Sequence, residues 1–459
     1  MNAIKYITLI VVGLFCSHSL YGQNMTLEEC RRMALENNKQ IAIAERTKEK
    51  AHLTVQATKT NFLPKLSAEG LGYYNNTNRD LNLKMGQMTL FDPNDLSGMV
   101  PTELMPLLNQ FSVLNIPDMN FNLKTSNTYV AGVNLEQPIY MGGKITSAYK
   151  MSKVGDEIAG LNRELTEDEI ILATDKAYWT CVQARELEKS ATQFKTTVEE
   201  FHRVVQNACE AGMKSKNDLM KVQVQLNQAE LQLRRAENGV RLSRMNLCHL
   251  LGLPLQSEIM PAESFSEQAF ELSGMADITA RPDWAILDKQ IELKKYEKQY
   301  VRSDFLPQVG VRGSYNYIHG IRLNNDPLFD GGSFSAMVSV RIPLFNWGEG
   351  VKKVKAAERE RQIMQLQRDD LGEKMSLEVE QALNLYNEAL LEIRLTRQAL
   401  EQTEENLRMS QDHYHAGLET ISDYLEAQTL RQHADGEYII ARTKLEIHKT
   451  EYLKATGRL

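Results

Sequence analysis

Features that mark several common classes of protein are scarce or missing in this sequence. The 459 residues carry 53 basic against 60 acidic side chains, so a net charge of −7 provides no basic surface for nucleic acid. The chain has no nucleophile, metal or phosphate motif, which argues against an enzyme or a cofactor site. Aromatic residues make up only 7% of the chain and charged residues 25%. This balance is typical of long, solvated helices.

The apolar run at the amino terminus is too short to cross a membrane. It extends from Ile7 to Cys16 and is followed by a polar stretch that ends at Gly22. These are the parts of a secretory signal, so we predict that residues 1–22 are a signal peptide. The bulky Leu14-Phe15 pair disfavours lipidation of Cys16, because small residues should precede a lipidated cysteine.

Cysteine is rare, and four cysteines remain after the signal peptide. They are Cys30, Cys181, Cys209 and Cys248. An even number in an exported protein permits disulfides. Their irregular spacing favours plain apolar packing instead, and we predict no structural disulfide.

The segment 129–252 recurs without a gap as 334–457. At this offset of 205, Pro138-Ile-Tyr140 falls on Pro343-Leu-Phe345. Upstream the offset is 243, so the first copy holds a 38-residue insertion within 75–128. The predicted domains are a first repeat, an inter-repeat connection and a second repeat, at 23–252, 253–280 and 281–459.

Two stretches without proline, 145–207 and 351–415, predict unusually long helices. At 1.5 Å per residue they would reach roughly 95 Å, which favours a coiled coil or a helical array. Apolar or small residues recur at spacings of three and four, as in a coiled-coil seam. Shorter helices are expected at 26–60, 214–250 and 420–456.

Four segments alternate apolar and polar residues, which predicts β-strands. They are 65–74, 129–137, 309–317 and 334–342. A half-buried sheet on a soluble core would show the same alternation. Export, and aromatic residues gathered at the strand ends, favour a transmembrane sheet with a lipid face and a lumen face. Such a sheet must close on itself and four strands are too few, so several copies must share one barrel.

Each long helix is followed by Ala-Gly, at 211–212 and 416–417, and then by Asp218 or Asp423. Glycine here predicts a helix cap and a reversal of the chain. Each aspartate falls where the next helix starts, where its carboxylate can meet the positive end of the helix dipole.

The same order of motifs occurs in both halves: Phe-Leu-Pro before the first strand, a Pro-Ile-Tyr-Met-Gly-Gly or Pro-Leu-Phe-Asn-Trp-Gly exit from the second strand, and an Ala-Gly…Asp hairpin. With these elements the mature chain resembles the TolC family of outer-membrane efflux channel proteins. The resemblance implies an α+β membrane protein, a trimeric α/β barrel. Its twelve-stranded outer-membrane β-barrel takes four strands from each protomer, and a long α-helical coiled-coil barrel extends into the periplasm.

The function implied by the resemblance is passive export from an inner-membrane pump. The protein would be the exit duct of a tripartite efflux or type I secretion system for small molecules or proteins. The implied partners are two further copies, outer-membrane lipid, a periplasmic membrane-fusion adaptor and a pump of the RND or ABC type. The alternative is a periplasmic coiled-coil adaptor or structural protein without a channel. That alternative does not explain two strand pairs with lipid and lumen faces.

The resemblance also implies a periplasmic gate at the second hairpin. The matching acidic residues are Asp423 and Glu426, one turn apart on one helix face, and Tyr414 matches a gate tyrosine. Glu419 stands where the family has a gate arginine, so we expect a more acidic and differently latched entrance. Asp218 matches a groove carboxylate of the first hairpin. Helix capping is the alternative role for both aspartates.

Three further sets of residues complete the expectations. The adaptor is expected to dock around Gly212 and Gly417, where small residues permit close helix approach. The barrel lumen is expected to carry Glu69, Glu136, Arg312 and Arg341. Asp412-His413-Tyr414-His415 and the methionines of the insertion could bind metal. A solvated helix end and apolar packing explain them more simply, so no metal site is predicted.

Overall fold

The structure is a computed structural model, and it describes residues 23–74, 78–84, 86–96, 99–124, 127–265, 277–324 and 326–459. The predicted signal peptide and Cys16 lie outside these residues. Two compact units are present. The helical unit takes its described residues from 23–55, 150–296 and 357–459. The sheet unit takes them from 56–149 and 297–356.

The predicted helix at 26–60 is two helices, α2 (Leu27–Asn37) and α3 (Lys39–Lys59). The capping box at its start is confirmed, because the Thr26 side chain accepts from Glu29 N and Glu29 accepts from Thr26 N. The prediction of one continuous helix was wrong at Asn38. This buried residue has an extended backbone, donates from Nδ2 to Leu250 O at 2.8 Å, and accepts from Gln40 N at 2.7 Å. The tertiary contact therefore interrupts the helix and caps the next one.

The second repeat has a matching contact, which supports the duplication at the level of atoms. Arg281 precedes α7 (Pro282–Ser303) as Asn38 precedes α3, and it donates to Ala455 O at 3.1 Å. Ala455 and Leu250 are themselves equivalent at the offset of 205. In both halves, a side chain before the short helix thus fixes the carboxyl end of a returning helix.

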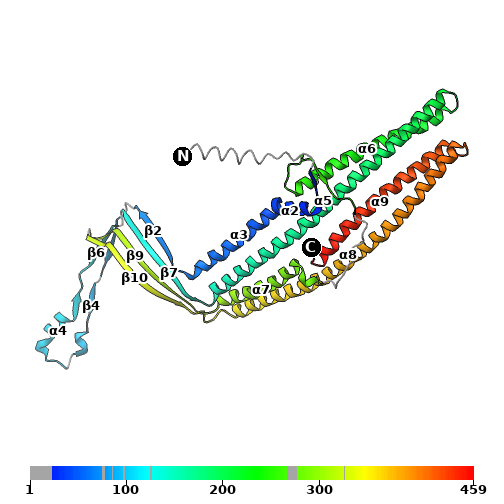
Figure 1. The fold of residues 1–459 in the computed structure, drawn as a ribbon. Helices are drawn as coiled ribbons and strands as arrows, with labels where there is room; N and C mark the ends of the chain where they lie inside the picture. The colour runs from blue at the N-terminus through cyan, green and yellow to red at the C-terminus, as the bar shows by residue number, and fades with distance from the viewer. Residues whose placement is uncertain are drawn as a thin grey trace, which may run out of the picture. The chain divides into compact units, whose positions relative to one another are not determined.

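The long helices are confirmed. The helices α5 (Lys144–Glu210) and α8 (Glu349–His415) have 67 residues each, and α6 (Lys216–Leu250) and α9 (Ile421–Ala455) return from their ends (Figure 1). In the described part of the chain, no helix is apolar enough over a sufficient length to cross a membrane.

The seam of each long helix is buried over part of its length, as the three-and-four spacing predicts. Val379, Ala382, Tyr386 and Ala389 are all buried on α8. On α5, the seam contributes to the largest apolar cluster. That cluster also contains Cys30, Cys181 and Cys248, which are free thiols, and burial raises the pKa of Cys30 to about 12. These cysteines act as small apolar side chains.

One buried carboxylate ties three helices of the helical unit together. Asp175 of α5 has no exposed surface, and Arg31 of α2 donates to its two oxygens at 2.8 and 2.6 Å. Thr450 of α9 donates to the same carboxylate at 2.7 Å. Since a buried charge is tolerated only when it is paired and hydrogen-bonded, this three-way contact fixes the relative positions of α2, α5 and α9.

The connection between the repeats is more than a linker. Its strand β8 (Ile259–Pro261) pairs in parallel with β1 (Gln23–Met25) at the start of the described chain. Phe265 stacks on Trp179 of α5, with 5.7 Å between ring centroids. The connection therefore fastens the amino-terminal segment to the helical unit.

The four predicted strands form an antiparallel meander in the sheet unit, in the order β2 (Lys65–Tyr73), β7 (Thr128–Met141), β9 (Gln308–Leu323) and β10 (Asp326–Arg341) (Figure 1). The last three are longer than predicted. Their register places Ala68, Val133, Tyr315 and Phe334 in one row on one face. The neighbouring row, on the other face, holds Ser67, Asn134, Ser314 and Ser335. The predicted apolar and polar faces are thus continuous across all four strands.

The described part of the insertion adds two strands to this sheet. Its strands β3 (Asn78–Leu83) and β6 (Met119–Lys124) pair with each other, and β6 also pairs with the end of β9. Farther out lie the short pair β4 (Gln87–Thr89) and β5 (Val113–Asn115), and the helix α4 (Met105–Phe111). The expected packing of the methionines was largely wrong, because Met88, Met99 and Met119 are exposed. A two-stranded ribbon with one short helix has too little depth to bury them.

Candidate functional site

The two helical hairpins end in nearly identical turns. Gly212 and Gly417 have φ angles of +75° and +74°, and a Cβ atom on either would meet open space. After each glycine, the next amide (Met213 or Leu418) donates to the carbonyl five residues earlier, at 2.8 and 2.9 Å. These are Schellman caps, as the Ala-Gly pairs predict.

Asp218 and Asp423 both cap the helix that follows the turn. Each is the third residue of its helix and completes a capping box, with Ser215 in the first hairpin and with Thr420 in the second. Hydrogen bonds from the Thr420 hydroxyl and amide lower the pKa of the Asp423 carboxyl. Asp423 remains exposed, as is Glu426 one turn later, so capping leaves both carboxylates open to solvent.

Tyr414 lies in an aromatic cluster that joins the two hairpins. Its ring stacks on Tyr424 of α9, with centroids 5.5 Å apart, and meets Phe201 of α5 edge to face at 5.5 Å. The ammonium of Lys214, from the first turn, lies 4.9 Å from the centre of the Tyr414 ring. Asp218, by contrast, forms its hydrogen bonds with Ser215 of its own turn. The structure therefore places Tyr414 between hairpins without joining it to Asp218.

Glu419 closes the second turn on itself. Its carboxylate accepts a hydrogen bond from the Ser410 hydroxyl and contacts His413 Nδ1 at 3.1 Å, and both partners are on α8. These two partners lower the pKa of the Glu419 carboxyl. Glu419, which stands where the family has a gate arginine, thus stabilises the turn of its own hairpin.

Lys221 provides a cross-hairpin contact that sequence reasoning missed. It lies on α6, and its Nζ donates to Ser422 Oγ of α9 at 2.9 Å. Its charge also lowers the pKa of the Asp423 carboxyl, after the larger effect of Thr420. A basic residue of the first hairpin therefore faces the acidic start of the second hairpin.

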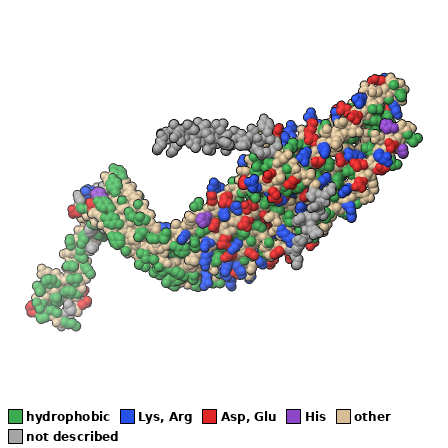
Figure 2. Space-filling view, viewed as in Figure 1, with side chains coloured by type: hydrophobic (Ala, Val, Ile, Leu, Met, Phe, Trp, Pro, Cys, Tyr) green, Lys and Arg blue, Asp and Glu red, His purple; other side chains and the backbone are tan. Residues whose placement is uncertain are grey.

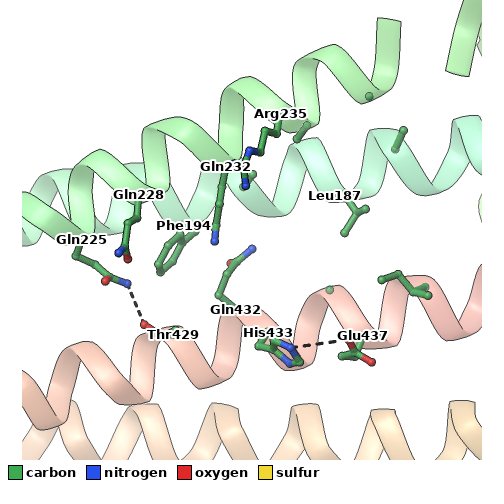
Figure 3. A pocket seen from close by; sticks show the side chains of 16 residues that line it. Leu187, Phe194, Gln225, Gln228, Gln232, Arg235, Thr429, Gln432, His433 and Glu437 are labelled. Carbon is green, nitrogen blue, oxygen red and sulfur yellow. Dashed lines mark hydrogen bonds and ion pairs between the residues drawn. The ribbon is translucent and has the colours of Figure 1, made fainter. Parts of the chain in front are cut away.

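A groove of about 520 Å³ lies in the helical unit, with α5 as its floor and α6 and α9 as its walls (Figure 3). The floor is apolar and includes Leu187 and Phe194, while the walls are rich in glutamine. Gln225 of α6 donates to Thr429 of α9 at 2.9 Å at one end of the groove. An apolar floor between polar walls matches the face of another amphipathic helix.

The four charged residues predicted for a lumen share the polar face of the sheet. Arg312 of β9 forms an ion pair with Glu136 of β7, its partner in register. Asn134 donates to Glu69 at 2.7 Å, and Arg341 of β10 is in register with Gln308. The mixed charges are thus brought together along one face.

The opposite face and the strand exits expose apolar side chains. Figure 2 shows hydrophobic side chains gathered over the sheet strands, whereas charged side chains cover the helices. After β10, Leu344, Phe345 and Trp347 are 91%, 69% and 87% exposed. Trp347 has a φ of +50°, and it occupies the place of Gly142 (φ +61°) in the first repeat.

Among the described residues, no group of three or more histidine, cysteine, aspartate or glutamate side chains is arranged to hold a metal ion. Two other residues escaped the sequence prediction. Met213 and Leu418 follow the tip glycines and are 74% and 76% exposed. Their equivalence at the offset of 205 was visible in the sequence.

Comparisons with known proteins agree with this geometry. The chain is 22% identical over 347 residues to the alkaline protease secretion protein AprF of Pseudomonas aeruginosa, covering 72% of this chain and 69% of that one. The fold matches the CmeC outer membrane channel of Campylobacter jejuni with a TM-score of 0.74 at 18% identity, covering 94% of this chain and 85% of that one. It matches the open state of the MtrE outer membrane channel of Neisseria gonorrhoeae with a TM-score of 0.71, also at 18% identity, covering 94% and 88%.

The family model described as outer membrane efflux protein matches residues 31–253 and 280–458. Because these matches take in most of the sequence, the chain belongs to the outer membrane efflux protein family.

Proposed function

We propose that three copies of this protein form one outer-membrane exit duct with a twelve-stranded barrel. The observation that carries the proposal is the sheet itself, which has an apolar face and a polar face but is not closed. In the described chain, the meander ends at β2 on one side and at β10 on the other. Strand edges cannot face lipid, so β10 of one copy must pair with β2 of the next. Light scattering of detergent-purified protein should give a trimer, and a stable monomer would refute this assembly.

The periplasmic entrance is proposed to be acidic, with Asp423 and Glu426 as its selectivity residues. Three copies would bring six exposed carboxylates to one constriction, which favours cations and repels anions. Asp423→Asn combined with Glu426→Gln should therefore weaken cation selectivity in planar bilayers. Unchanged selectivity would show that these residues lie away from the conduction path.

We also propose that Lys221 latches the closed entrance in place of the missing gate arginine. Its hydrogen bond to Ser422 and the electrostatic effect of its charge on Asp423 join the first hairpin to the second. Lys221→Met should raise the open fraction of the channel, whereas Lys216→Met, near the start of the same helix, should not. An equal effect of both substitutions would indicate a general charge effect.

The partners are proposed from the hairpins. A periplasmic membrane-fusion adaptor would dock around Gly212 and Gly417, where Met213 and Leu418 offer exposed apolar side chains. Its helices would also fit the groove of Figure 3. The pump would be of the RND or ABC type, and the likeness to a protease secretion protein favours type I secretion as a duty to test beside small-molecule efflux.

The remaining proposals concern the chain outside the site. Residues 1–22 act as a cleaved signal peptide, and the repeats at 23–252 and 281–459 are joined by 253–280. The protein passes cargo passively and needs no cofactor.

Single-channel recordings of purified trimers are the deciding experiment, and small cation-selective steps are expected. Failure of the protein to insert into the bilayer would favour the alternative function, a periplasmic coiled-coil adaptor or structural protein without a channel.

A further inference from the structure

The second repeat shows that a strand pair of this chain closes without an insertion. There, β9 ends at Leu323 and β10 begins at Asp326. In the first repeat the equivalent strands are separated by residues 74–127, whose described parts form their own strands and a helix. The insertion is therefore unnecessary for the sheet, and its structure calls for a separate role.

The outer part of the insertion, described at residues 86–96 and 99–119, carries a cluster of exposed apolar side chains that we call the knob. Met99 is 84% exposed, and Phe111 and Leu107 are 63% and 55% exposed. The cluster is completed by Met88, Leu90, Leu104, Leu114 and Met119, all of them exposed. In Figure 2, hydrophobic side chains gather at the tip around α4 and β4. A contiguous apolar patch of this kind marks an interaction surface.

Helix α4 and the residue before it expose an apolar stripe. Leu104, Leu107 and Phe111 recur at spacings of three and four and are exposed. The next residue, Ser112, is buried, and its carbonyl accepts from Leu90 N at 2.7 Å, which holds the end of α4 against the segment after β4. Met105 and Leu108 of α4 are partly buried, whereas Leu104, Leu107 and Phe111 form an exposed row of apolar anchors.

The charge of the knob selects among occupants. Residues 86–119 contain Asp92, Asp95, Glu103 and Asp118, and no lysine, arginine or histidine. Two knobs would therefore repel each other, and an anionic lipid surface would repel a knob. A partner that brings apolar side chains flanked by basic ones would be attracted, because its apolar face fills the stripe and its charges meet the carboxylates.

We propose that the knob is a docking surface for a cationic amphipathic helix of another polypeptide. The Leu104–Leu107–Phe111 stripe receives the apolar face of that helix, and the acidic residues pair with its lysines or arginines. This role goes beyond conduction and does not depend on the gate.

The test uses the full-length protein in nanodiscs of phosphatidylcholine and a fluorescent peptide. The probe is an amphipathic helix of about 18 leucine and lysine residues, and its counterpart has glutamate at every lysine position. Fluorescence anisotropy should show the lysine peptide binding at least about tenfold more tightly than the glutamate peptide. Leu104→Ser, Leu107→Ser and Phe111→Ser together should weaken that binding by about tenfold or more.

A second variant tests the charges separately. Asp92→Asn, Asp95→Asn and Glu103→Gln together should weaken binding several-fold and remove most of its salt dependence. Both variants should remain trimeric and conduct like the parent protein, which separates a failure of this inference from a failure of the channel assignment.

Four results would overturn the proposal. The first is equal binding of the lysine and glutamate peptides, and the second is unchanged binding to the serine variant. The third is efficient disulfide formation between Leu107→Cys residues of different copies, which would make a second copy the occupant. The fourth is stronger attachment of the knob to vesicles with phosphatidylglycerol than to the peptide, which would identify a lipid surface as the occupant of the knob.

Discussion

Removal of the buried charge at Asp175 should weaken the helical unit far more than removal of an exposed charge beside it. Asp175→Asn preserves the size of the side chain and its contact with Thr450, but it leaves Arg31 without its buried anion. Breaking a fully buried ion pair costs about 3–5 kcal/mol. The Arg31 side chain is 25% exposed and also contacts Glu28 at 2.8 Å, so we expect about 2–3 kcal/mol here.

The matched control is Glu28→Gln, which removes the exposed partner of the same arginine. The Glu28 side chain is 78% exposed, so the loss should stay within about 0–1 kcal/mol. Thermal unfolding followed by circular dichroism at a fixed scan rate should show the midpoint falling by about 4–12 °C for Asp175→Asn, and by less than about 4 °C for Glu28→Gln. Equal shifts for the two variants would refute the reasoning.

Two further predictions concern the membrane contact and the hairpin tip. Brominated lipids should quench the fluorescence of Trp347 but spare the buried Trp179 and the partly buried Trp284. A variant that retains only Trp347 should therefore lose most of its fluorescence in these lipids. Strong quenching of a variant that retains only Trp179 would contradict the exposure pattern. The lowered pKa of Glu419 means that its contacts with Ser410 and His413 stabilise the tip above pH 4.5 and are lost as the pH falls further. Hydrogen-exchange protection across 410–420, taken relative to the intrinsic exchange rate at each pH, should fall below that pH in the parent protein, and Glu419→Gln should already show low protection at neutral pH.

Periodicity and the internal repeat predicted most of the fold. The long helices, the four strands and their two faces followed from local patterns that tertiary structure did not override. The break at Asn38 could not be predicted, because its cause is the carbonyl of Leu250, distant in sequence. The pairing of β1 with β8 was hidden for the same reason, since each strand has only three residues.

The candidate site was predicted less completely than the fold. The caps at Gly212 and Gly417 could be predicted from residue type, because glycine after a helix by itself indicates a cap and a reversal of the chain. The contact of Lys221 with Ser422 depends on how two hairpins face each other, and no local pattern records that. For the same reason, the position of Tyr414 beside Tyr424 and Phe201 emerged only from the structure.

The left-handed backbone at Trp347 shows how duplication freed one half of the chain to change. At Gly142, a Cβ atom would lie 2.6 Å from Ser303 O and 2.8 Å from Leu306 Cβ, so the first copy admits only glycine. The second copy accepts a tryptophan at the same turn, at a cost of about 1–2 kcal/mol in backbone strain. An assembly of three such chains would contain six copies of this turn, with near-sixfold symmetry in the backbone. Only the three turns of the second repeats would carry the tryptophan. One inherited turn therefore serves tight packing in the first half and an exposed aromatic side chain in the second.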